Sequence, residues 1–483
     1  MQHWGDEIVI EPVRGFPCRV YAARPRDLGT LLQDTAGFAD RRALVQGNRV
    51  VAFAELPSLV GAVAATLAEG GVAPGDRLLL HGRNGIDWVL RLWATWRVGA
   101  IPALANPAWT PAQLEGVSRL VATDPQPQGV SRLVAGEDRP GVLVFTSGTT
   151  AAPKAATLSH RSVIANLQAL LHQAGRLPGG EPKPPTVTLI SVPLFHIGGL
   201  QQVLTAALSG GCLVFDSGRF DPVETLEVME RERVQVWAAV PTMVSRLLDA
   251  WSGQDLSSVR AVTMGGAPVS AELRERVRAV FPSVKRGAGI SYGLTEAGGV
   301  VAAGVGPELE SRPGSVGRPT PLVDVRIVAE EIQVRSAAVM TGYWGQVENP
   351  VSPDGWLATG DQGRLDGDGY LYVAGRAKDV VIRAGENVSC PRVEAVLATH
   401  PAVAEVAVVG LPDADLGERV AAVVVLRTGC SPDELTAFAR HALARYEVPS
   451  DWWLRDEPLP VNAAGKVVKA ALAIAWPARL QVK

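Results

Sequence analysis

The sequence predicts an α/β protein with a large N-terminal portion and a small C-terminal α+β domain. The first observation is an alternation of apolar strands with a helix at Asp76–Leu80, Asp87–Val98 and Ala100–Leu104. Such alternation is typical of a parallel sheet that is covered on both faces. The second observation is a change in composition near Arg376, after which a compact pattern of strands and helices follows. That segment has about the size of an independent domain.

Local signals delimit the N-terminal elements. A helical stretch is expected at Asp27–Ala36 and a hairpin strand at Val50–Ala54. Apolar residues recur at helical spacing over Ser58–Glu69, and Gly70–Gly71 follows as a C-cap. Glycine suits that position because it adopts the left-handed conformation that ends many helices.

A phosphate-binding loop is indicated within Val142–Lys154. The apolar run Val142–Phe145 reads as a buried strand, and Thr146–Lys154 then switches to small hydroxylated residues with one Gly, one Pro and one Lys. Backbone N–H groups and hydroxyls of such a loop donate to anionic oxygens, and the lysine adds a positive charge. The Walker pattern GxxxxGK[ST] is absent, so the loop is of another kind.

The alternation continues beyond this loop. Ser159 or His160 is suited to cap a helix that runs to about Gln173, and Thr186–Val192 reads as a strand. The later expected features are a strand at Ala261–Met264 with a glycine turn at Gly265–Pro268, a charged helix at Glu272–Val280, a loop at Gly289–Glu296, and a strand- and turn-rich region over Pro319–Leu371.

The C-terminal segment is expected to be a separate domain. We place the large domain at residues 1–376, the small domain at residues 377–483, and the hinge at Arg376–Lys378. The elements expected in the small domain are Val380–Ile382, Pro391–Thr399, Val403–Val409, Arg419–Leu426 and Pro432–Arg445, in a βαββαβ-like order.

Composition narrows the functional class. The 483 residues carry a formal net charge of −3, so nothing in the charge balance points to nucleic acid or to an anionic membrane surface. The four cysteines are scattered without a CxxC pair, which indicates reduced thiols rather than a disulfide framework or a metal site. No signal peptide is visible, and no apolar run approaches the ~18 residues that a spanning helix needs. We therefore expect a cytoplasmic protein without a membrane span.

Six short motifs carry the functional prediction. They are TSGTT at 146–150, YGLTE at 292–296, TGD at 359–361, GRAKD at 375–379, GEN at 385–387 and NAAGK at 462–466. In this order, and over nearly the whole chain, they resemble the signatures of the adenylate-forming superfamily of acyl-CoA synthetases, adenylation domains and luciferases. The resemblance implies a large N-terminal domain of stacked α/β subdomains with a β-rich subdomain, followed by a small mobile α+β domain.

The implied chemistry explains these residue types. A carboxylate attacks the α-phosphorus of ATP and pyrophosphate leaves, so an enzyme must neutralise charge and align two anions. By resemblance, the departing phosphates would be held by Thr146, Ser147, Thr149, Thr150 and Lys154. Thr295 would contact the α-phosphate, and Glu296 would position Mg²⁺.

The resemblance also implies a nucleotide site. Tyr292 would lie against adenine beside the turn formed by Gly265, Gly266 and Ala267, with Ser291 and Gly293 as its neighbours. Asp361 would accept hydrogen bonds from the ribose hydroxyls, and Arg376 would reach the ribose–phosphate side.

Other implied roles involve the acyl group and the small domain. Lys466 would place its charge on the carboxylate and α-phosphate oxygens, and His196 would help to form the acyl pocket. Lys378 occupies the hinge position. When the small domain rotates for thiol attack, the loop Arg383–Glu386, which contains Gly385, would reach the site. The apolar candidates for the wall of the acyl pocket are Phe195, Trp237 and Val240.

The sequence departs from the family signature at two positions. Ala151 and Ala155 replace glycines of the phosphate loop. Where a glycine has positive φ, alanine costs roughly 1 kcal/mol or changes the loop shape. One interpretation is harmless drift, and the other is a weakened ATP half-reaction.

We therefore predict an acid–thiol ligase that forms acyl-CoA from a hydrophobic carboxylic acid through an acyl-adenylate, with ATP, Mg²⁺ and coenzyme A. The alternatives are a poorly adenylating variant that takes acyl-AMP from a separate adenylating enzyme, and an enzyme that loads a carrier protein. A non-catalytic adenylate-binding protein is a third class, and the retained Glu296, Asp361 and Lys466 argue against it. Fatty acids, aryl acids and bulky acids of secondary metabolism all remain open as substrates.

Overall fold

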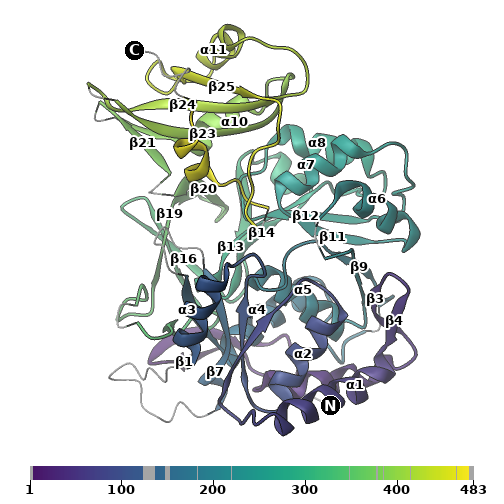
Figure 1. Cartoon of the computed structure of the whole chain (residues 1–483). Coiled ribbons are helices and arrows are strands. Elements are labelled where there is room, and N and C mark those ends of the chain that lie inside the picture. Colours follow the sequence, from purple (N-terminus) through teal and green to yellow (C-terminus); the bar gives the residue numbers. More distant parts are fainter. Residues whose placement is uncertain are drawn as a thin grey trace.

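In the described part of the chain, the computed structural model contains three sheets of five or more strands, with helices packed against them (Figure 1). A short hairpin of β1 (Ile8–Val13) and β2 (Phe16–Tyr21) precedes them. The structure describes residues 4–122, 136–146, 153–181, 183–218, 220–346, 349–376, 379–384, 386–413, 415–463 and 465–477. Across these ranges, we find no helix with the length and apolar character needed to cross a membrane.

The first sheet carries the phosphate-loop hairpin. Its order among the described residues is β18-β8-β7-β6-β5. Strands β5, β6 and β7 are parallel, whereas β7 and β8 form an antiparallel pair. The bounds are β5 Arg77–His81, β6 Ile101–Ala105, β7 Pro140–Thr146, β8 Lys154–Ser159 and β18 Gly342–Tyr343. The helices in this part of the chain are α1 Leu56–Glu69, α2 Ile86–Arg97, α3 Pro111–Ala122 and α4 His160–Gln173.

The second sheet joins the α/β part to the β-rich part. In the described ranges it has the order β16-β17-β19-β20-β15-β14-β13-β12-β11-β9-β10-β3-β4. The neighbours from β3 through β10, β9, β11 and β12 to β13 are parallel, and β13 pairs antiparallel with β14. The bounds are β3 Arg42–Gln46, β4 Arg49–Ala52, β9 Val187–Ile190, β10 Cys212–Phe215, β11 Val236–Ala239, β12 Ala261–Gly265, β13 Gly289–Leu294, β14 Gly299–Gly304, β15 Ser315–Pro319, β16 Asp324–Val328, β17 Glu331–Arg335, β19 Leu357–Leu365 and β20 Leu371–Arg376.

Helices α5 Ile197–Leu208, α6 Pro222–Arg231, α7 Pro241–Ala250, α8 Ala271–Val280 and α9 Pro307–Glu310 belong to this part of the chain. Their starts follow from local chemistry. Asp221 caps α6 by accepting hydrogen bonds from the N–H groups of Val223 and Glu224, and proline occupies the first turn of α6 and of α7.

The C-terminal sheet is built from residues after Asp379. Its described strands are β21 Val380–Arg383, β22 Glu386–Ser389, β23 Val403–Asp413, β24 Gly417–Leu426 and β25 Asp451–Arg455, with helices α10 Cys390–Leu397, α11 Pro432–Arg440 and α12 Lys469–Ile474. Two clusters of buried apolar side chains, one around Val388, Val393 and Val424 and one around Leu459 and Trp476, belong to this segment alone.

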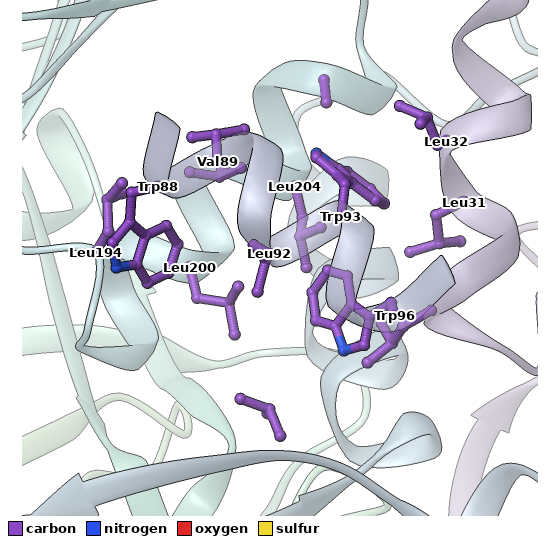
Figure 2. Close-up of a cluster of buried hydrophobic side chains, with 14 of the residues drawn as sticks. Leu31, Leu32, Trp88, Val89, Leu92, Trp93, Trp96, Leu194, Leu200 and Leu204 are labelled. Atoms are coloured by element: carbon purple, nitrogen blue, oxygen red, sulfur yellow. The ribbon is translucent and has the colours of Figure 1, made fainter. Parts of the chain in front are cut away.

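The largest apolar cluster of the described residues includes side chains of α2, α5 and the 3₁₀ helix η1 (Leu28–Phe38). Figure 2 shows Trp88, Trp93 and Trp96 of α2 with leucines of η1 and α5. Trp96 also donates a 2.8 Å hydrogen bond from Nε1 to the Gly141 carbonyl, next to the start of β7. Buried aromatic rings contribute much of the apolar area that stabilises a core, so this cluster fixes the base of the first sheet.

Most elements expected from the sequence are confirmed, with shifts of one to a few residues at their ends. Ser159 caps α4 as expected, accepting a hydrogen bond from the Ser162 N–H. The expected loop at Gly289–Glu296 is wrong: Gly289–Leu294 is strand β13, and only Thr295–Ala297 forms a 3₁₀ turn. Glycines suggested a turn there, but pairing with β12 and β14 overrides that local tendency. The expected domain boundary stays a prediction.

Candidate active site

The candidate site lies where β11 and β12 reach their carboxyl ends. Val240 follows β11, and Gly265–Ala267 forms the turn at the end of β12. In open α/β sheets, the crevice beyond the carboxyl ends of the strands is the usual ligand-binding place. In Figure 1 the yellow C-terminal chain descends from the small sheet toward this edge.

Glycines keep the turn after β12 open to neighbouring groups. Gly266 has a φ of +79°, and a Cβ built on it would lie 3.1 Å from Lys466 Cε. A Cβ on Gly265 would lie 2.6 Å from Ser291 Oγ. Side chains at these two positions would therefore obstruct the approach of Lys466 and of β13.

Lys466 is presented by a short hairpin of the C-terminal segment. We call Val461–Val467 the lysine hairpin; its ends pair as a β-bridge, and Ala464 lies outside the described residues. The Lys466 N–H donates to Asn462 Oδ1 at 3.0 Å, and the Asn462 N–H donates to the Lys466 carbonyl at 2.8 Å. Thr242 of α7 donates from Oγ1 to the Gly465 carbonyl at 2.5 Å. The hairpin is thus internally bonded and is also attached to the large portion of the chain.

Charges gather around the Lys466 ammonium group. The Lys466 side chain retains contact with solvent, yet partial burial and the positive charge of Arg376 lower its pKa, against the opposing effects of Asp361 and Glu296. Burial, followed by the charge of Lys466, lowers the pKa of His196 to about 4. The imidazole of His196 is therefore neutral at pH 7, and five residues predicted from separate motifs share one electrostatic environment.

Asp361 is held from two sides. Tyr292 donates from its hydroxyl to Asp361 Oδ2 at 2.6 Å, and Arg376 Nε lies 3.3 Å from Asp361 Oδ1. Asp361 and Arg376 are partners in the register of β19 and β20. Only 6% of Asp361 is exposed, and burial together with this carboxylate raises the pKa of Tyr292. The sequence predicted both residues at the nucleotide but did not predict their contact.

Glu296 has a partner that the sequence analysis missed. Tyr343 of β18 donates from its hydroxyl to Glu296 Oε1 at 2.8 Å, and Lys154 Nζ lies 5.2 Å from the centre of the Tyr343 ring. Tyr343 therefore connects the first sheet, which carries Lys154, with the 3₁₀ turn after β13, which carries Glu296. Its only sequence signal is the pair Gly342–Tyr343 in a strand-rich region, which is too short to be noticed alone.

The Glu296 carboxylate has an oxygen that is suited to bind a magnesium ion. In the described part of the chain, Tyr343 is the hydrogen-bond partner of the Glu296 carboxylate through Oε1, which leaves Oε2 for a cation. Mg²⁺ in nucleotide sites commonly uses one or two carboxylates together with phosphate oxygens and water. The described residues contain no group of three or more His, Cys, Asp or Glu side chains arranged to hold a metal by themselves.

The phosphate loop is only partly described. Thr146 and Lys154 are register partners at the ends of β7 and β8, and Thr146 Oγ1 lies 3.5 Å from the Lys154 carbonyl oxygen. The predictions for Ser147, Thr149, Thr150 and Ala151 lie outside the described residues, as do those for Lys378 and Gly385. Thr295 begins the turn after β13, one residue before Glu296.

The interpretation that Ala155 strains the backbone of the phosphate loop is wrong. Ala155 is a fully buried strand residue of β8 that pairs with Phe145, and it is not among the described non-glycine residues with positive φ. Its carbonyl accepts a 2.7 Å hydrogen bond from the Trp344 N–H. An alanine in extended conformation carries no backbone strain, so this replacement does not distort the hairpin.

Of the apolar residues expected at the acyl pocket, Val240 and Phe195 lie beside other candidate site residues, and their role in the pocket stays a prediction. Val240 lies between the two approaching segments, because its Cγ2 would be 2.8 Å from a Cβ on Gly465 and its Cγ1 3.7 Å from one on Gly266. Phe195 packs beside His196, with ring centres 4.3 Å apart. Trp237 does not face the site: it is fully buried in the core and donates from Nε1 to Ser191 Oγ at 2.9 Å. Gly293 lies on β13, where a Cβ would clash with the Gly299 carbonyl oxygen.

Two family models match this chain. The model for "AMP-binding enzyme" matches residues 32–123 and 118–344, and the model for "AMP-binding enzyme C-terminal domain" matches residues 392–466. The second match begins after β22 and ends at Lys466 of the lysine hairpin.

Known relatives cover nearly the whole chain. Feruloyl-CoA synthase of an Amycolatopsis species is 34% identical over an alignment of 476 residues that covers 88% of this chain and 94% of that protein. Indoleacetate–CoA ligase of Aromatoleum aromaticum is 33% identical over 483 aligned residues, covering 87% and 92% of the two chains.

Solved structures agree with the fold. The o-succinylbenzoate CoA synthetase of Bacillus subtilis, in complex with its acyl-adenylate intermediate, superposes with a TM-score of 0.79 at 27% identity, covering 94% of this chain and 99% of that one. The same enzyme in complex with ATP and a magnesium ion gives a TM-score of 0.76 at 28% identity, covering 92% and 99% of the two chains.

Proposed function

This chain belongs to the AMP-binding enzyme family and is an acyl-CoA synthetase that works through an acyl-adenylate; from this premise we propose that it activates an aromatic carboxylic acid, with Lys466, Asp361 and Glu296 as the residues that organise the first step. The observation that carries the role of Lys466 is its position at the turn after β12, where a Cβ on Gly266 would lie 3.1 Å from Lys466 Cε, and where Asp361 and Glu296 act on its charge. One cation of the C-terminal segment thus lies within the electrostatic influence of two carboxylates from the large portion of the chain.

In the first step, Lys466 neutralises the reacting anions. The substrate carboxylate oxygen forms a bond to the α-phosphorus of ATP, and the bond to pyrophosphate breaks. An ammonium group beside the carboxylate and the α-phosphate oxygens reduces their repulsion and stabilises charge in the transition state. The contact of the lysine hairpin with Thr242 supports this placement.

Glu296 and Lys154 serve the phosphate side. A magnesium ion on Glu296 Oε2 would supply charge neutralisation to the phosphates. Tyr343 orients the Glu296 carboxylate by donating a hydrogen bond to Oε1. Lys154, whose ammonium lies over the Tyr343 ring, would pair with a departing phosphate. Asp361 faces the ribose, with Tyr292 and Arg376 holding its two oxygens in place.

In the second step, the CoA thiol attacks the acyl carbon and AMP leaves. Lys466 has no role in that attack, so we propose that the small domain rotates and brings the hairpin between β21 and β22 to the site. Ala384, which follows β21, is exposed and has a φ of +52°, a left-handed conformation that reverses the chain direction.

The acyl group is proposed to be aromatic. Phe195 and Val240 are apolar, and His196 is uncharged at pH 7, so this side of the site suits a flat apolar ring. Feruloyl-CoA synthase and indoleacetate–CoA ligase, two relatives over most of the chain, are named for aromatic acyl groups.

A panel of carboxylic acids tests the proposal. Ferulate, indoleacetate, medium-chain and long-chain fatty acids are each assayed with ATP and CoA, and again as preformed adenylates with CoA, by mass detection of acyl-CoA. We expect aryl-CoA and AMP from ATP, with aryl acids preferred about tenfold. Preference for long-chain acids would contradict the substrate class. Thioester formation from preformed adenylates but not from ATP would contradict the assigned first step. Labelling of a phosphopantetheinyl protein without free acyl-CoA would contradict the assigned second step.

A further inference from the structure

A second lysine of the C-terminal segment lies between two carboxylates. Lys469 Nζ is 2.9 Å from both Asp379 Oδ1 and Oδ2, and 2.8 Å from Glu394 Oε1. The side chains of Lys469, Asp379 and Glu394 are 26%, 31% and 18% exposed. These three groups therefore form a partly desolvated cluster, in which charge-assisted hydrogen bonds are stronger than at an open surface.

The three groups come from three separate elements. Asp379 precedes β21 and is the first described residue after Arg376, Glu394 lies on α10, and Lys469 begins α12. Glu394 is itself fixed, because its Oε1 also accepts a 2.7 Å hydrogen bond from the Val408 N–H of β23. The carboxylates raise the pKa of Lys469 against the effect of burial, so the lysine stays charged.

The cluster is connected to the site at both ends. On one side, the Asp379 N–H donates to the Arg376 carbonyl at 2.9 Å, and Arg376 Nε lies 3.3 Å from Asp361 Oδ1. On the other side, Lys469 follows the lysine hairpin, whose base is closed by the 2.8 Å hydrogen bond from the Val468 N–H to the Pro460 carbonyl. Two cations near the candidate site, Arg376 and Lys466, are thus joined through Lys469.

We propose that Lys469 is a positioning residue that fixes the lysine hairpin to the segment leaving the large domain. The proposal rests on the proposed function of Lys466 in the first step. Because the hairpin and Asp379 are tied together, a rotation near Arg376 moves Lys466 by a defined path instead of letting the hairpin swing independently. Without the tie, Lys466 is misplaced in the first step, while the second step, which does not use Lys466, continues.

The test measures the two half-reactions separately. Lys469→Met is compared with Lys469→Arg, which keeps the charge, and with Arg440→Met, which removes an exposed cation from α11 of the same segment. Lys469→Met is expected to lower ATP–pyrophosphate exchange about tenfold or more, because small misplacements of a reacting group cost large factors in rate. Thioester formation from acyl-AMP and CoA should change less than about threefold, and Lys469→Arg should recover most of the exchange activity.

Amide hydrogen exchange over residues 460–468 provides a readout that needs no substrate. Faster exchange in Lys469→Met, with normal exchange in Lys469→Arg and Arg440→Met, is expected. Equal loss of both half-reactions, unchanged pyrophosphate exchange, or unchanged amide exchange in the hairpin would overturn the proposal. If Lys469→Met does not fold, Asp379→Asn, which leaves Glu394 as partner, should show the same selective defect at smaller size. A wild-type protein without pyrophosphate exchange would count against the proposed function, whereas the amide exchange experiment would still decide the positioning role.

Discussion

Two hairpins each bring a lysine to the candidate site, and they are held in different ways. Lys154 stands at the start of β8, in a strand pair whose next residues, Phe145 and Ala155, are buried. The lysine hairpin carrying Lys466 is held from outside, by Thr242 at the Gly465 carbonyl. Near its base, Arg246 of α7 makes hydrogen bonds of 2.8 and 3.2 Å to Glu405 and one of 3.1 Å to the Leu459 carbonyl.

The difference indicates when each lysine acts. A lysine that is part of a buried sheet keeps its place through both half-reactions, because moving it would break the sheet. A lysine held by a few polar side-chain contacts is released when those contacts break, each at a modest cost in free energy. We therefore assign Lys154 to the fixed part of the site and Lys466 to the part that leaves after the first step.

The largest expected effect comes from removing Lys466. Lys466→Ala should lower ATP–pyrophosphate exchange by about 10²- to 10³-fold, the usual size of the loss when one group that stabilises transition-state charge is removed. Thioester formation from preformed acyl-AMP should be nearly unchanged. Stopped assays of each half-reaction with the same acid measure both values, and a similar loss in the two would remove the distinction between the fixed and the released lysine.

The pH profile of the first step gives a matching expectation. The pKa of Lys466 is lowered, so the ammonium loses its proton at a lower pH than an ordinary lysine. Activity that depends on the charged form is present at low pH and is lost as pH rises through this folded-state pKa. Pyrophosphate exchange should therefore fall on the alkaline side earlier than thioester formation from acyl-AMP. If the two activities fell over the same alkaline pH range, the assignment of the charged form of Lys466 to the first step alone would be contradicted.

Tyr343→Phe tests the fixed part of the site, which contains Lys154 and Glu296. Loss of the hydroxyl removes the hydrogen bond to Glu296 while the ring near Lys154 remains. Residues that orient a metal ligand typically affect metal affinity or activity by about 10-fold or more. We expect about a tenfold rise in the Mg²⁺ concentration needed for half-maximal pyrophosphate exchange. An unchanged magnesium titration would show that Tyr343 does not orient Glu296.

Arg246→Met weakens the attachment of the C-terminal segment near the base of the lysine hairpin, and its effect on activity should be smaller than that of Tyr343→Phe. The ion pair with Glu405 is partly buried, with side-chain exposures of 25% and 12%. The substitution should weaken the contact between α7 and the C-terminal segment by about 1 kcal/mol of free energy. Pyrophosphate exchange should then fall roughly fivefold, while thioester formation stays equal or rises slightly. Arg49→Met, which breaks an exposed pair with Asp87 far from this contact, is the control. A matching loss in the control would assign the effect to general destabilisation.

Ala155→Gly should have the smallest effect on activity. If the alanine strained the phosphate-loop hairpin, glycine would speed adenylation; because Ala155 is an unstrained, buried strand residue, we expect no gain. Glycine in a strand should instead lower the free energy of unfolding by about 1 kcal/mol. Denaturant unfolding measures the stability and pyrophosphate exchange measures adenylation. Faster adenylation in Ala155→Gly would show that the alanine does strain the phosphate-loop hairpin.

The sequence predicted the pattern of elements from local signals, and the resemblance of its motifs to a known family pointed to the polar residues of the candidate site. Strand and helix periodicity, caps at Ser159 and Gly70, and the ordered motifs were all readable along the chain. Contacts between distant positions were not. Tyr292 of β13 meets Asp361 of β19 although three strands separate them in the sheet order, and Tyr343 reaches Glu296 from β18 at the edge of another sheet.

Two incorrect expectations have physical causes. Trp237 was placed at the acyl pocket because it is apolar and near Val240, but residue type does not show which face of a strand points to the core. Gly289–Glu296 was expected to be a loop because glycine favours turns, although strand neighbours on both sides determine its conformation.

The separate apolar clusters of the C-terminal sheet have a practical consequence for engineering. Because its strands and helices bury their side chains largely among themselves, this segment is suited to being made as an independent polypeptide. Split-protein reconstitution, with the chain divided between Arg376 and Asp379, would then turn the meeting of Lys466 with Asp361 and Glu296 into a bimolecular event. Catalytic output would report the association of the two fragments, which makes the fold a candidate scaffold for a proximity sensor.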